Sequence, residues 1–78
     1  MPNKIKLIWD FRGPHAQGTA EHHRIHLEEF VIKEGLSIND TGVEQINDML
    51  SIAYMIVEEK DMIPVRDALR PHRGEVAE

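Results

Sequence analysis

Two histidines stand four residues apart, at His22 and His26. If this segment is helical, the spacing places one imidazole ring above the other, so both could bind the same metal ion. Glu29 lies close to the same ridge and could supply a third ligand. The pattern lacks the HExxH arrangement and also arises by chance, so two solvated surface histidines are the alternative. The sequence therefore offers His22 and His26 as candidate metal ligands and points to no particular cofactor.

A second group of candidates combines aromatic and titratable side chains. Its members are Trp9, Asp10, His23 and Tyr54. Aromatic walls with a few polar groups are typical of a small-molecule pocket, in which Asp10 or His23 could serve as a base. In the alternative, Trp9 and His23 belong to the core, the Tyr54 hydroxyl is hydrogen-bonded on a sheet, and Asp10 pairs with a cation at the surface. The residues alone leave both interpretations open.

Composition excludes several classes of partner. The net charge is −5 and, apart from Arg66, Arg70 and Arg73, the lysines and arginines are scattered, whereas nucleic-acid binding depends on clustered cations. No segment approaches the ~20 consecutive apolar residues that span a bilayer. The chain has no cysteine, which removes disulfides and fits a reducing compartment. We therefore expect no nucleic-acid partner, no membrane association and a cytoplasmic location.

The most apolar stretch runs from Ser51 to Glu58. In an extended chain, Ile52, Tyr54 and Ile56 point one way and the intervening apolar residues point the other way. Apolar side chains on both faces are typical of a central strand. This segment is predicted to be the strand on which the rest of the domain packs.

The segments before it alternate between strand and helix patterns. Met1 to Phe11 alternates after Asn3, with Ile5, Leu7, Trp9 and Phe11 on the expected buried side. A helix is expected from Thr19 as N-cap to Gly35 as C-cap. Its apolar side carries Ala20, His23, Leu27, Phe30, Val31 and Glu34.

Residues 41–46 fit either a short strand or a helical turn. We favour a strand, joined to the central strand by a turn at Asn47 and Asp48. A second helix is expected after Asp61 as cap, with Pro64 tolerated in its first turn and Pro71 ending it. Gly74 to Glu78 could add a short last strand.

These elements predict one domain over residues 1–78 with an α+β, ferredoxin-like sandwich. The expected order is strand, helix, strand, strand, helix and a short last strand, with an antiparallel sheet and both helices on one face. The other face of the central strand then lacks a cover. Pairing sheet to sheet with a second copy would bury that face and enlarge the small core of a chain of 78 residues, so a homodimer is expected.

The element order resembles that of the dimeric α/β-barrel superfamily, whose small ferredoxin-like domains pair by their sheets. The similarity covers an aromatic first strand with Trp9 and Phe11, a polar first helix, and the passage AYMIVEEKDMIPVRDALRP from strand to short helix. The superfamily includes monooxygenases of quinone-like substrates, haem-degrading enzymes, sugar mutarotases and regulatory ligand-binding domains. The resemblance thus implies a fold and a dimer, and leaves the activity open.

Three functional hypotheses follow. The first is a homodimeric domain that binds a small molecule or serves as an interaction module. The second is a cofactor-free monooxygenase-like or isomerase-like enzyme with a barrel pocket near Trp9 and Tyr54 and with Asp10 or His23 as base. The third is a metal-binding protein that uses His22 and His26.

Overall fold

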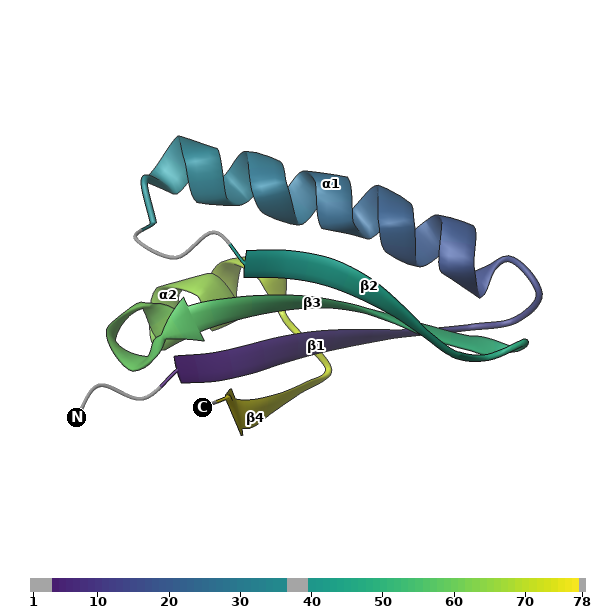
Figure 1. Ribbon diagram of the computed structural model, residues 1–78. Coiled ribbons are helices and arrows are strands. Elements are labelled where there is room, and N and C mark those ends of the chain that lie inside the picture. The colour runs from purple at the N-terminus through teal and green to yellow at the C-terminus, as the bar shows by residue number, and fades with distance from the viewer. Residues whose placement is uncertain (1–3, 37–39, 78) are drawn as a thin grey trace.

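The computed structural model describes residues 4–36 and 40–77 and shows an α+β fold: an open antiparallel sheet of four strands with two helices (Figure 1). The elements, in chain order, are β1 (Lys4–Arg12), α1 (Ala16–Glu34), β2 (Asp40–Asn47), β3 (Leu50–Glu58), α2 (Glu59–Leu69) and β4 (Arg73–Ala77). The first three residues of the predicted first strand, and Glu78 of the predicted last one, lie outside the described residues.

The strands are ordered β2-β3-β1-β4, and each neighbouring pair is antiparallel. β3 therefore lies inside the sheet, as its apolar sequence predicts. β2 confirms the expectation of a strand over residues 41–46, and the turn after Asn47 joins β2 to β3. β4 confirms the short last strand.

The core lies between the helices and one face of the sheet. Strands β1 and β3 contribute Leu7, Trp9, Ala53, Met55 and Val57, and the helices contribute Ala20, Leu27, Val31 and Val65. All of these side chains are at most 3% exposed. The odd-numbered side of β1 thus faces the helices, as its alternating sequence predicts, while Ile8 on the even-numbered side is also buried.

Helix α1 begins earlier than the sequence indicates. Its first residue is Ala16, and Thr19 lies inside the first turn instead of capping it. The Thr19 hydroxyl donates to the His15 carbonyl oxygen at 3.1 Å, four residues back, so it bonds within the helix. The predicted end is confirmed, because Gly35 adopts the left-handed conformation that favours glycine (φ 63°).

Helix α2 also begins before the expected residue. It starts at Glu59 and not after Asp61, so both acidic residues occupy the first turn, where the helix dipole favours them. Pro64 consequently lies in the second turn and not in the first. The helix ends at Leu69, two residues before Pro71.

Candidate functional site

The exposed side of α1 carries His22 and His26 side by side. Their Nε2 atoms are 3.1 Å apart, and their rings meet at 83° with centroids 4.7 Å apart. The Nδ1 atom of His26 lies 3.1 Å from Oε1 of Glu29. The helix therefore brings the two predicted metal ligands together, while Glu29 contacts the far nitrogen of His26.

In the described part of the chain, no further set of potential metal ligands gathers around this pair. Among residues 4–36 and 40–77, no three His, Cys, Asp or Glu side chains come together as a metal site. Nearby, Arg24 pairs with Glu28 at 2.6 Å, and Glu28 also accepts a hydrogen bond from the Thr41 hydroxyl. Arg24 thus directs its charge towards Glu28.

His23 faces the opposite way, into the core. Its ring lies 5.0 Å from the Trp9 ring and 5.4 Å from the Phe11 ring, measured between centroids. Its Nε2 atom is buried and has no hydrogen-bond partner within the described part of the chain. Burial of the ring, reinforced by neighbouring histidines, lowers the pKa of His23 below its ordinary value. The lowered pKa therefore favours the neutral form of His23, which packs against the two aromatic rings.

Trp9 is fixed between the first strand and the second helix. It is 3% exposed, and its indole Nε1–H donates to the carbonyl oxygen of Leu69, at the end of α2, at 2.9 Å. A buried donor needs such a partner. Trp9 thus joins β1 to α2 in addition to filling the core.

Asp10 and Tyr54 lie on the sheet face that the helices leave uncovered. Oδ1 of Asp10 is 3.3 Å from the Arg73 guanidinium on β4, and the Asp10 amide donates to Nδ1 of His72 at 2.8 Å. Nζ of Lys6 lies 4.5 Å from the centre of the Tyr54 ring. Both residues therefore have local partners on their own face.

The four candidate pocket residues consequently separate into two pairs. Trp9 contacts His23 on the helix-covered face, because Trp9 is paired with Ala53 across the β1–β3 ladder. Tyr54 is paired with Ile8 and thus lies on the other face with Asp10. A pocket between two sheets could be lined by Asp10 and Tyr54, but Trp9 and His23 would remain outside it.

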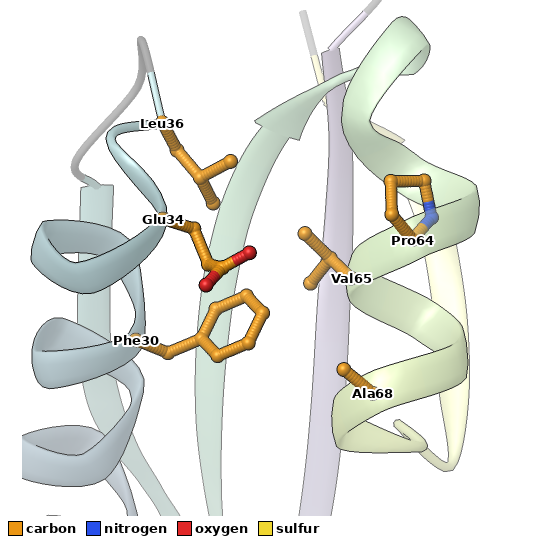
Figure 2. A pocket seen from close by; sticks show the side chains of 6 residues that line it. All are labelled: Phe30, Glu34, Leu36, Pro64, Val65 and Ala68. Carbon is orange, nitrogen blue, oxygen red and sulfur yellow. The ribbon is translucent and has the colours of Figure 1, made fainter.

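A pocket of roughly 210 Å³ lies between α1 and α2, where sequence reasoning indicated no site. It is lined by Phe30, Glu34, Leu36, Pro64, Val65 and Ala68. Figure 2 shows the Glu34 carboxylate directed into the gap between the two helices, with Val65 and Pro64 on the far side. The signal in the sequence was the position of Glu34 on the mainly apolar stripe of α1, which also carries His23.

No protein-family model, curated protein or solved structure matches this chain. Within the described residues, neither helix has the length and apolar character needed to cross a membrane.

Proposed function

We propose that this chain is a ferredoxin-like domain that functions as a homodimer, joined through the open face of its sheet, and that serves as an interaction module. The β-α-β-β-α-β succession is the one that defines ferredoxin-like domains, and both helices pack against the same face of the sheet. The opposite face is then available to a second copy.

The observation that carries this proposal is the apolar centre of the open face. The cross-strand register places Ile8, Ile52, Tyr54 and Ile56 together there, on the two inner strands. Ile8 and Ile52 are already at most 3% exposed within the single chain, so the apolar area left for a second copy to cover comes from Tyr54 and Ile56, which are half-buried. An apolar centre within a polar rim is the usual composition of a protein interface.

The charges around this centre favour a second copy as the occupant. On the half formed by β2 and β3, the open face carries the carboxylates Asp40, Glu44 and Glu58, and these strands contain no lysine or arginine. The half formed by β1 and β4 carries the cations Lys4, Lys6, Arg12 and Arg73 against Asp10 and Glu75. Rotating a second copy by a half-turn about an axis parallel to the strands places the acidic half over the basic half.

The area of the open face of the sheet also fits a second copy of this chain. Four strands spaced about 4.8 Å apart, with inner strands of nine residues rising about 3.3 Å each, cover roughly 500 Å² in projection. Side chains enlarge the accessible area above that projection, towards the approximately 800 Å² that each partner buries in a standard interface. A sheet-to-sheet dimer therefore needs most of the open face and no further element.

Native mass spectrometry and sedimentation equilibrium at 10–50 µM protein test the dimer. We expect the wild-type mass to be twice that of the chain, and we expect Ile56→Glu to yield monomers because it places a carboxylate in the apolar centre. Ile32→Glu is the matched control, since Ile32 is 75% exposed on α1 and away from the sheet. A wild-type monomer, or an Ile56→Glu protein that dimerises as well as Ile32→Glu, would overturn the proposal.

The pocket between the helices supports a second candidate function, the binding of a small organic cation. The side chains that line it are apolar apart from the Glu34 carboxylate, which is directed into it. Glu34 is also the last residue of α1, where the helix dipole adds partial negative charge. A short alkylamine matches this combination, because its chain can contact Phe30 and Val65 while its ammonium pairs with Glu34.

Titration with hexylamine, hexanol and hexanoate, followed by amide chemical shifts, tests this second function. We expect hexylamine to shift the amides around Phe30 and Val65 at the lowest concentration and hexanoate to shift them least. Glu34→Gln should weaken hexylamine binding at least several-fold, while Glu21→Gln, an exposed position near the start of α1, should not. Equal responses to the three ligands would contradict a cation site.

A further inference from the structure

We propose that His22 and His26 form a two-ligand chelate for a divalent transition-metal ion, with Glu29 acting as the hydrogen-bond partner that orients His26. The two Nε2 atoms already lie 3.1 Å apart on a regular helix of 19 residues. A metal ion that binds both nitrogens would replace the hydrogen bond between them, so the proton on Nε2 of His22 would move to Nδ1 of the same ring by exchange with water, and both exposed rings would rotate towards the ion.

The distance matches the geometry of metal–imidazole bonds. With metal–nitrogen distances of about 2.0–2.1 Å, two nitrogens 3.1 Å apart subtend an angle of roughly 100° at the metal. This value lies between the 90° of square-planar or octahedral sites and the 109° of tetrahedral sites. The pair thus suits Cu²⁺, Ni²⁺ and Zn²⁺, which are the divalent ions that imidazole ligands favour.

Glu29 determines which nitrogen of His26 is available. A carboxylate oxygen can only accept a hydrogen bond, so the nitrogen facing it at 3.1 Å, Nδ1, must carry the proton. In the neutral ring, Nε2 then presents its lone pair towards His22. Carboxylates that hold a ligating histidine in this way also strengthen its binding to the metal. Glu29 therefore acts through His26 and is a positioning residue, not a ligand.

The surroundings of the pair also favour a cation. The neighbouring cation Arg24 is paired with Glu28 at 2.6 Å, and the whole chain carries a net charge of −5. Both imidazoles are exposed, so water can complete the coordination shell. Because only two side chains would bind the ion, we expect an affinity in the micromolar range for Cu²⁺ and weaker binding of Ni²⁺ and Zn²⁺.

This site is independent of the proposed dimer, because it lies on α1 and not on the open face of the sheet. It is tested by isothermal titration of the metal-free chain with Cu²⁺, Ni²⁺ and Zn²⁺ at pH 7.5, together with metal content after equilibrium dialysis. We expect one Cu²⁺ per chain, a rise in Tm at saturating Cu²⁺, and the affinity order Cu²⁺ above Ni²⁺ and Zn²⁺.

Variants test whether the metal ion binds at His22 and His26 or at another histidine. His22→Ala and His26→Ala should each lower the Cu²⁺ affinity at least tenfold, while His15→Ala and His72→Ala, which replace exposed histidines elsewhere, should leave it within twofold. Glu29→Gln should weaken binding three- to tenfold while keeping one ion per chain. Far-UV circular dichroism confirms that each variant retains its helices. Equal affinity of the wild type, His22→Ala and His26→Ala would overturn the proposal, as would a larger loss in His15→Ala or His72→Ala.

Discussion

The aromatic ring of Tyr54 lies across the backbone of Gly42, its direct partner on the neighbouring strand. A Cβ atom at position 42 would overlap the outer part of this ring, so only glycine allows the ring to lie flat on β2. Nζ of Lys6 also lies over the Tyr54 ring, 4.5 Å from its centre, so the ring has neighbours on both adjoining strands of the open face. An aromatic residue that covers a strand glycine compensates for the side chain that the glycine lacks.

Replacement by alanine is expected to have opposite effects at Gly42, which the Tyr54 ring covers, and at Gly18, which lies in α1. Gly42→Ala should lower the free energy of unfolding by about 1 kcal/mol, because the new methyl group displaces the Tyr54 ring. Gly18→Ala should raise it by roughly 0.5–1 kcal/mol, since Gly18 is helical and a Cβ there meets no atom within 4 Å. Urea unfolding followed by circular dichroism measures both changes.

A double-mutant cycle identifies the cause of the loss at position 42. If the ring is responsible, Tyr54→Thr should remove most of the cost of Gly42→Ala, giving a coupling free energy of about 0.5–1 kcal/mol. A cost of Gly42→Ala that is the same with and without the Tyr54 ring would contradict this explanation.

The partly buried ring of His23 predicts an acid-sensitive fold. Burial, followed by the charges of His26, His72 and His22, lowers the pKa of His23 in the folded chain. The unfolded chain, with a histidine pKa of about 6.5, therefore binds the proton more readily. This contribution to stability is complete above the unfolded pKa and is lost as the pH falls towards the folded pKa. We expect the urea midpoint to decrease between pH 7 and pH 5, measured with EDTA to exclude metal ions.

His23→Leu supplies the matched test. It removes the titrating ring and the buried Nε2 that lacks a partner among the described residues, so it should flatten the pH dependence and leave stability at pH 7 unchanged or higher. His15→Leu, at an exposed position, is the control and should retain the wild-type pH dependence. A wild-type profile in His23→Leu would assign the acid sensitivity to other groups.

Trp9 links two elements that are far apart in sequence, and its replacement should be costly. Trp9→Phe removes the hydrogen bond to the Leu69 carbonyl oxygen and part of a side chain that is 3% exposed. We expect a loss of about 2–3 kcal/mol, from the combined cavity and unpaired acceptor. Circular dichroism must follow the unfolding, because the chain has no other tryptophan. Ile32→Ala, on the surface of α1, should change stability by less than about 0.5 kcal/mol.

The architecture was accessible from sequence because it depends on short-range patterns. Alternation in β1 identified its buried side, and the two apolar sides of β3 indicated a strand inside the sheet. The predicted N-cap was wrong by four residues in α1 and by three residues in α2. In α1 the reason is that the Thr19 hydroxyl can bond to the backbone either as a cap or within a helix. A pattern in the residue types does not distinguish these two geometries.

The candidate sites also differ in whether they depend on local sequence or on contacts between distant segments. His22 and His26 lie together because their contact depends only on the helical repeat. Whether Trp9 and Tyr54 share a face depends instead on the register between two strands, which neither strand encodes by itself. The position of Glu34 on the buried stripe of α1 marks one wall of the pocket, but the pocket itself depends on how α2 packs beside α1, and this relationship between distant segments has no local signal.

Pro64 offers a last prediction, at the wall of that pocket. It is the sixth residue of α2, so it cannot donate the hydrogen bond that the helix directs to the carbonyl group of Lys60. Pro64→Ala should restore this bond and raise the free energy of unfolding by about 1–2 kcal/mol, after allowance for the greater freedom of the unfolded chain. Arg66→Ala, at an exposed position in the same helix, should change it by less than about 0.5 kcal/mol.

Pro64→Ala is also expected to change the stability of the fold and the affinity for hexylamine in opposite directions. Because Pro64 lines the pocket, Pro64→Ala removes part of an apolar wall and should weaken hexylamine binding even as the fold becomes more stable. A higher free energy of unfolding together with weaker hexylamine binding is expected only if the ligand contacts the ring of Pro64. Tighter hexylamine binding in the more stable variant would instead indicate that the ligand responds to the order of α2 and does not occupy the gap beside Pro64.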